Sequence, residues 1–187
     1  SRSENQLLTD VCSLYEASII LSANPVVAED VQDLISSLKM KEKIFSREPY
    51  YLGFYYRAMG DLLKLLEKYQ EAAKMYENAV AIHLKERYLY ELGHDWYLCA
   101  SVHSLAGNRK SALEAIEMAL KYDRAAENTF AIASDYEAYG RILLKNLPSQ
   151  EEKDSAVKAL NWASAIYDSG GYPARSEECR NAAAAVN

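Results

Sequence analysis

The residues best suited to chemistry in this sequence are Cys99 and His103, which lie four positions apart in a helix-forming stretch. On one helical face, a thiol and an imidazole at this spacing could act as a nucleophile and its general base. The flanking sequence supplies neither an oxyanion hole nor a group that would orient the imidazole. Both residues also fall on positions that the helical pattern buries. We therefore expect them to pack in the core, and we expect no catalytic residue.

Other signs of cofactor or metal chemistry are equally weak. His94, Cys99 and His103 do not stand at a spacing typical of metal ligands. Gly170-Gly171 lacks both the following lysine and the preceding strand of a phosphate-binding loop. The sequence therefore predicts no cofactor and no metal ion, and it favours a protein that is not an enzyme.

The composition narrows the class of protein. Hydrophobic residues make up 50% of the 187 residues and charged residues 26%, which is enough apolar side chain for a buried core. With only 7 Gly and 4 Pro, and no alternating run of β-branched residues, the chain is expected to be helical. A net charge of −6 argues against direct binding of nucleic acid, because phosphate recognition needs a basic surface.

Sequence features also predict the cellular compartment of the protein. No apolar run approaches the roughly 18 residues of a membrane-spanning helix, and no signal peptide opens the chain. The three cysteines, Cys12, Cys99 and Cys179, are odd in number and far apart, so they predict buried thiols in a reducing compartment. We therefore expect a cytoplasmic protein that does not enter a membrane.

A pattern of large and small side chains recurs three times. In its first copy Tyr56, Met59, Gly60 and Leu63 share one helical face, and Tyr69, Ala72, Tyr76 and Ala79 share a face of the next helix. The first set returns 40 residues later (96 − 56) as Trp96, Cys99, Ala100 and His103, and again (136 − 96) as Tyr136, Tyr139, Gly140 and Leu143. Large side chains opposite small ones allow two antiparallel helices to interlock.

This pattern divides the chain into helical hairpins. We expect one domain over 1–187, with a helical pair in 1–48, repeats at 50–90, 91–127 and 128–169, and a C-terminal capping helix at 172–187. The helices of the N-terminal pair are predicted at 3–22 and 27–46. Those of the first repeat are predicted at 50–66 and 69–88. In the third repeat, four extra residues are expected to lie in a loop at 146–153.

The pattern resembles the tetratricopeptide repeat (TPR), whose signature is W-x2-L-G-x2-Y followed by Y-x2-A-x3-F-x2-A. The resemblance covers about residues 50 to 168, and it implies an all-α fold in which helical hairpins form a right-handed superhelix. Repeats of 40 to 44 residues are longer than the usual 34, and in this they look like the sensor regions of bacterial transcriptional regulators. Arg109 departs from the pattern, because the family prefers an aromatic residue there.

The resemblance also implies a binding groove, since the first helix of each TPR hairpin lines the concave side. The corresponding positions hold Phe54, Arg57, Asp61 and Lys64, then His94, Tyr97, Ser101 and Ser104, then Ser134, Glu137, Arg141 and Leu144. Arg57, Lys64 and Arg141 could hold carboxylates, and Phe54, His94 and Tyr97 could stack on a ligand. The alternative is an ordinary solvated face, in which Arg57 pairs with Asp61 four residues later.

Two functions are compatible with these patterns. The first is a non-catalytic module that binds a protein or peptide segment in the groove. The second is a ligand- or peptide-sensing regulatory domain of a larger bacterial transcriptional regulator, suggested by the long repeats and by the absence of an initial Met. Self-association into a homodimer stays open under both hypotheses, because exposed end helices can pair with a second copy.

Overall fold

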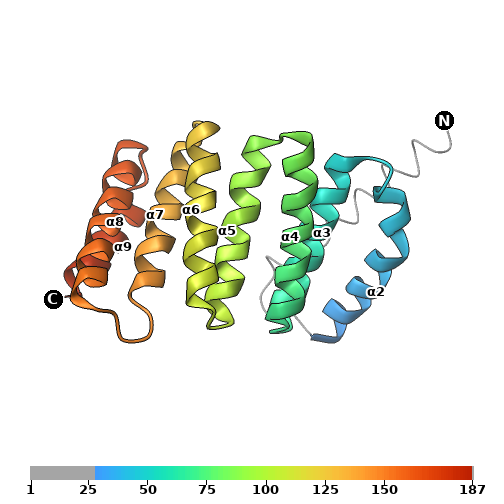
Figure 1. Cartoon of the computed structure of the whole chain (residues 1–187), viewed down its shortest axis with the longest axis horizontal. Helices are drawn as coiled ribbons and strands as arrows, with labels where there is room; N and C mark the ends of the chain where they lie inside the picture. The colour runs from blue at the N-terminus through green and yellow to red at the C-terminus, as the bar shows by residue number, and fades with distance from the viewer. Residues whose placement is uncertain (1–27, 187) are drawn as a thin grey trace. The chain divides into compact units, whose positions relative to one another are not determined.

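The computed structural model describes residues 28–186, which form eight α-helices and no strand (Figure 1). The helices are α2 (Ala28–Phe45), α3 (Pro49–Leu65), α4 (Tyr69–Glu86), α5 (Leu89–Leu105), α6 (Arg109–Ala125), α7 (Thr129–Leu143), α8 (Gln150–Ser169) and α9 (Pro173–Ala184). The predicted all-α class is thus confirmed for this part of the chain. The helix expected at 3–22 and the thiol of Cys12 lie outside the described residues.

The chain divides into two compact units, the first ending at Tyr88 and the second beginning at Leu89. In the first unit α3 packs against both α2 and α4. The largest fully buried side chains of the first unit include Leu38 and Phe45 from α2, Leu62 from α3 and Tyr76 from α4. In the second unit α5 pairs with α6 and α7 with α8, while α6 also contacts α7 and α9 covers α8.

The helices follow the periodicity of the sequence. The first helices of the three hairpins begin at Pro49, Leu89 and Thr129, which is a constant spacing of 40 residues (89 − 49 and 129 − 89). One boundary differs from the prediction, because α8 begins at Gln150, inside the stretch expected to be a loop. Ser149 explains this early start: its hydroxyl accepts the backbone N–H of Glu152, whose carboxylate accepts the N–H of Ser149 in return.

Small residues meet large ones across the hairpins, as the pattern predicts. A Cβ atom added to Gly60 of α3 would lie 2.5 Å from the ring of Tyr76 in α4. In the third hairpin, a Cβ on Gly140 would lie 2.9 Å from Cγ of Leu160. These glycines are needed because the facing side chain occupies the space that a methyl group would fill.

A second small position in each of the first two hairpins faces a buried polar side chain. A Cβ on Gly53 would meet the imidazole of His83, and a Cβ on Gly93 would meet the carboxyl of Asp123. Both polar residues are essentially inaccessible to solvent. The two pairs are equivalent in the repeat, since both members are displaced by 40 residues (93 − 53 and 123 − 83).

Arg109, the departure from the repeat pattern, ties two hairpins of the second unit together. Its Nη2 donates to the carbonyl of Leu143, 2.8 Å away, and lies 2.8 Å from Oε1 of Glu152. The start of α6 is thereby joined to the end of α7 and to the first turn of α8. A charged side chain thus makes a contact between hairpins at a position where the tetratricopeptide pattern has an aromatic residue.

The candidate chemical residues lie where the pattern predicts. Cys99 and Cys179 are buried, and burial raises the pKa of the Cys179 thiol to about 11. His103 is half-buried. Among residues 28–186, no set of three His, Cys, Asp or Glu side chains is arranged to hold a metal ion.

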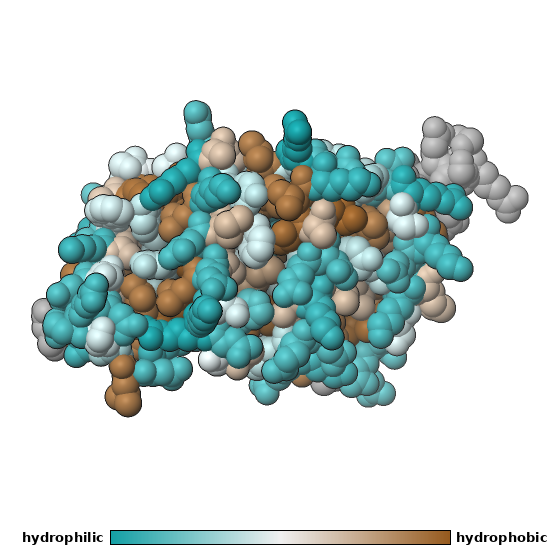
Figure 2. All heavy atoms as spheres, viewed as in Figure 1, coloured by the Kyte–Doolittle hydropathy of each residue, from teal (hydrophilic) through white to brown (hydrophobic). Residues whose placement is uncertain are grey.

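The surface is largely polar. Hydrophilic side chains cover most of the face drawn in Figure 2, with hydrophobic side chains showing between them. No helix from α2 to α9 combines the length and the apolar character needed to cross a membrane.

Candidate functional site

A pocket of about 230 Å³ opens in the second unit between α5, α7 and the first turn of α9. Residues of α5 form one wall, residues of α7 and Lys145 form the opposite wall, and Arg175 of α9 closes one end. The lining residues are Tyr97, Ser101, Ser104, Leu105, Ser134, Glu137, Ala138, Arg141, Ile142, Lys145 and Arg175.

Six of these residues come from the groove positions expected in the second and third repeats. Tyr97, Ser101 and Ser104 lie on α5, and Ser134, Glu137 and Arg141 lie on α7. Residues three and four apart share one helical face, so each helix presents its three groove residues on the same side. The side-by-side placement of equivalent helices then brings the two sets together around one cavity.

The remaining predicted groove residues lie elsewhere. Phe54, Arg57, Asp61 and Lys64 belong to the first unit. Neither His94, an exposed residue of α5, nor Leu144, which directly follows α7, lines the pocket. Arg57 is buried, with its guanidinium 4.8 Å from the centroid of the Phe54 ring. The carboxylate of Asp61 accepts the hydroxyl of Tyr76 at 2.7 Å and lies 3.5 Å from Nζ of Lys64.

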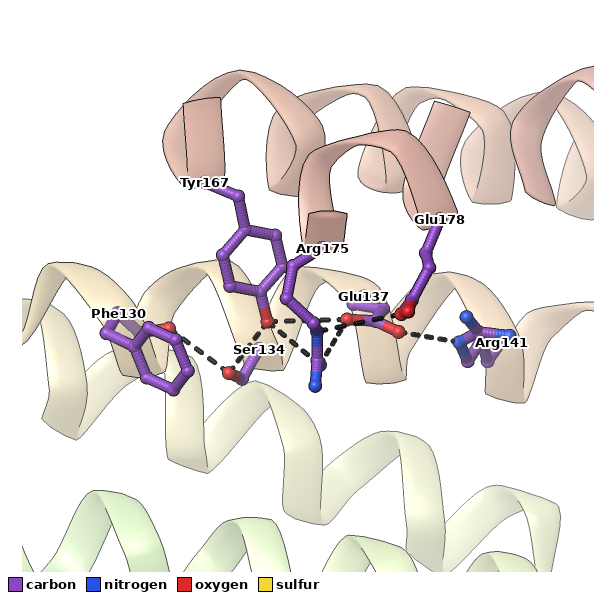
Figure 3. A network of polar contacts seen from close by, with 7 residues as sticks. All are labelled: Phe130, Ser134, Glu137, Arg141, Tyr167, Arg175 and Glu178. Carbon is purple, nitrogen blue, oxygen red and sulfur yellow. Dashed lines mark hydrogen bonds and ion pairs between the residues drawn. The ribbon is translucent and has the colours of Figure 1, made fainter. Parts of the chain in front are cut away.

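Glu137 is the centre of the pocket's polar network (Figure 3). Its Oε1 accepts Nε of Arg141 at 2.9 Å, and its Oε2 accepts Nη2 of Arg175 at 2.6 Å. The hydroxyl of Tyr167 donates to the same Oε2 at 3.3 Å. Only 9% of the Glu137 side chain is exposed, whereas 51% of Arg141 and 43% of Arg175 are exposed. One buried carboxylate therefore fixes two half-exposed guanidinium groups.

The charges of this network stabilise one another. Burial alone would raise the pKa of Glu137, but the hydrogen bonds from Arg175 and Arg141 outweigh that effect and lower it. The hydrogen bond between Arg175 and Glu137 also raises the pKa of Arg175, so the Arg175 guanidinium stays charged. Burial, reinforced by the charge of Glu137, raises the pKa of Tyr97 and keeps its hydroxyl protonated. With Lys145, the pocket holds three cations and one carboxylate.

Contacts behind the pocket hold Arg175 in place. Its guanidinium lies 5.2 Å from the centroid of the Tyr167 ring, and its Nη2 donates to the Tyr167 hydroxyl at 3.1 Å. The Tyr167 hydroxyl is also 2.9 Å from the hydroxyl of Ser134. The helix that carries Arg175 is anchored by a buried contact between Ser164 of α8 and Ser176 of α9, whose hydroxyls are 2.9 Å apart.

Sequence reasoning missed the two cations that complete the pocket. Lys145 follows the last turn of α7 and donates to the hydroxyl of Ser104 at 2.7 Å and to its carbonyl at 3.3 Å. Arg175 lies outside the repeats, in a helix expected only to cap the array. One signal was available, because a cation in the first turn of a helix opposes the helix dipole and suggests a specific partner.

The donors of the pocket favour recognition of an anionic or hydrogen-bond-accepting group. Guanidinium, ammonium and hydroxyl groups converge from three elements, and the single carboxylate is already paired. Thiol and imidazole side chains are absent from the lining residues. The arrangement is a pocket lined by hydrogen-bond donors in an all-α protein built from repeated helical hairpins.

Neither a protein-family model nor a curated protein matches the sequence. Among solved structures, the chain is similar to the crystal structure of BtubC (BKLC) from P. vanneervenii, with a TM-score of 0.53 and 15% sequence identity. The match covers 100% of this chain and 91% of that chain. At this identity the similarity concerns the fold alone.

Proposed function

We propose that this chain is a non-catalytic protein- or peptide-binding module, and that the pocket between α5, α7 and α9 holds a segment of its partner. The hairpins are TPR-like repeats, the building blocks of right-handed helical superhelices. One observation carries the proposal: six groove positions from two consecutive repeats line a single pocket together with two further cations.

The size of the pocket supports binding of a segment over binding of a whole small molecule. A volume of about 230 Å³ is below the roughly 300–1,000 Å³ of pockets that enclose drug-sized ligands. It suits one side chain or the end of a peptide, with the rest of the partner on the surface. A peptide-sensing regulator would use the same pocket, and a DNA-binding domain in the parent gene would distinguish that role.

The test is an unbiased selection of random linear peptides displayed on phage, using the whole folded chain as bait. We expect a related set of peptides to be enriched, and their addition should shift the amide resonances of Tyr97, Ser101 and Glu137 in nuclear magnetic resonance spectra. Failure to enrich any sequence over bait-free beads would refute the proposal. Enriched peptides that shift only resonances outside the pocket lining would refute its assignment to this site.

A further inference from the structure

We propose that the pocket selects acidic peptide segments, with a Glu or Asp carboxylate of the partner bound between Arg141 and Arg175. This inference rests on the proposed function and names the ligand class of the same site.

Both arginines retain donors that the protein itself does not use. Arg141 contacts Glu137 through Nε, and neither of its terminal nitrogens donates to any residue within 28–186. Arg175 uses Nη2 for Glu137 and Tyr167, while its Nη1 makes no hydrogen bond to the described part of the chain. Because each guanidinium is about half-exposed, these nitrogens can reach a ligand. Two guanidinium edges toward one cavity match the paired oxygens of a carboxylate.

Glu137 prepares this site without neutralising it. Its carboxylate holds Arg141 and Arg175 in place, so less side-chain freedom is lost when a ligand binds. Glu178 adds a second negative charge, since its Oε2 lies 3.9 Å from Nε of Arg175. Two negative charges against Arg141, Arg175 and Lys145 leave a local excess of about one positive charge. That excess is the opposite of the whole chain, whose net charge is −6. An acidic ligand is therefore attracted to this pocket while most of the surface repels it.

The rest of the lining favours a carboxylate that belongs to a peptide. Leu105, which is 50% exposed, and Ile142 provide an apolar wall beside the cations. The hydroxyls of Tyr97 and Ser101 make no hydrogen bond with residues 28–186 and can bond to a backbone carbonyl. A free oxyanion would use the cations and could accept from these hydroxyls, but it would make no contact with the apolar wall. We therefore infer an acidic residue next to an apolar one.

The test uses two synthetic peptides with acetylated and amidated ends, Leu-Glu-Glu-Leu and Leu-Gln-Gln-Leu, with inorganic phosphate as a third probe. Each is titrated into the full chain, and affinity is measured from shifts of the Tyr97, Ser101 and Arg141 amide resonances. We expect the glutamate peptide to bind saturably at low salt and more weakly at high salt. The glutamine peptide and phosphate should bind at least about tenfold more weakly.

Two variants separate a specific site from general charge attraction. Arg141→Gln should lower the affinity for the glutamate peptide by about tenfold, because the substitution removes one charge-assisted contact. Lys158→Gln makes the same change of charge at an exposed position of α8 outside the pocket lining, and it should leave the affinity unchanged. Unchanged circular dichroism and melting of both variants would establish that they remain folded.

The outcomes distinguish this inference from the proposed function. Equal binding of the two peptides, or selection of neutral peptides that still map to the pocket, would refute acidic selectivity and leave peptide binding intact. Phosphate binding as tightly as the glutamate peptide would show a simple anion site and overturn the inference. An equal loss of affinity for the glutamate peptide in Arg141→Gln and Lys158→Gln would also overturn the inference. Failure of both the glutamate peptide and the display selection would refute the proposed function itself.

Discussion

Replacing Asp135 by Asn should remove a pH dependence from the stability of the second unit. Asp135 on α7 and Asp123 on α6 are buried side by side, each with about 1% of its surface exposed. Asp123 receives the side-chain amide of Asn128 at 3.4 Å, whereas neither oxygen of Asp135 has a partner when both carboxyls are ionised. Burial raises the pKa of both groups, and the charge of Asp123 raises that of Asp135 further.

We therefore expect the pair to share one proton in the folded protein. In the unfolded chain both carboxyls ionise near pH 4, while folding raises the pKa of Asp135 to about 9. The stabilisation is thus fully present below about pH 4 and is lost as the pH rises toward 9. One extra bound proton corresponds to a decrease of roughly 1 kcal/mol in the free energy of unfolding per pH unit.

Urea unfolding followed by tryptophan fluorescence measures this effect directly. The chain has two tryptophans, Trp96 and Trp162, and both belong to the second unit. Between about pH 5 and 8, the free energy of unfolding of the wild type should fall with rising pH more steeply than that of Asp135→Asn. The two slopes should differ by roughly 1 kcal/mol per pH unit. The exposed Asp168→Asn serves as the control and should follow the wild type. If the free energies of Asp135→Asn and wild type decline in parallel, the shared proton does not exist.

Further predictions follow from other contacts. Glu137→Gln should lower the free energy of unfolding of the second unit by roughly 1–2 kcal/mol at neutral pH, because two charge-assisted hydrogen bonds are lost between partly exposed groups. Since the pKa of Glu137 is lowered on folding, this difference should begin to shrink as the pH falls below about 4 and should vanish only below the lowered pKa of the folded state, and a constant difference in the same fluorescence assay would contradict it. Gly60→Ala should destabilise the first unit by roughly 1–3 kcal/mol, because its Cβ would overlap the ring of Tyr76; circular dichroism in urea measures this, and an unchanged midpoint would refute the packing. Ser149→Ala should remove the capping box of α8 and lower the free energy of unfolding by about 1 kcal/mol. A urea midpoint restored by Ser149→Asp would support a capping role for Ser149 over a packing role.

Much of the fold could be predicted from the sequence because the repeats encode their own packing. The helix expected at 50–66 is observed at Pro49–Leu65, and the glycine at position 60 does face the ring of Tyr76. Such agreement arises because local helix propensity and the large-small alternation favour the same pairing. The start of α8 was misplaced because the insertion in the third repeat was counted as loop, although Ser149 and Glu152 form an N-terminal cap.

The site was only partly predictable, for a physical reason. Helical periodicity places Tyr97 and Ser101 on one face of α5 and Arg141 on the corresponding face of α7, and the structure puts all three in one pocket. Periodicity carries no information about Lys145 and Arg175, because Lys145 lies in the loop between α7 and α8 and Arg175 lies beyond the repeats. Their positions depend on tertiary packing, above all on the contact between Ser164 and Ser176 that anchors α9. That contact, together with the hydrogen bonds of Arg175 to Glu137 and Tyr167, places a charged residue of the capping helix in the site.

The buried polar residues opposite Gly53 and Gly93 have a consequence for how the chain reaches its structure. Hairpins with the same large-small surfaces can compete for one another's partners during folding, which is a known route to misassembly of repeat proteins. Here the equivalent position holds an imidazole in one hairpin and a carboxyl in the next. A carboxyl buried without Asn128 and Asp135 would lose its hydrogen bonds, at a cost of about 1–3 kcal/mol. Differing polar residues at one repeated position therefore disfavour exchange of hairpins and help each one to fold in its own place along the chain.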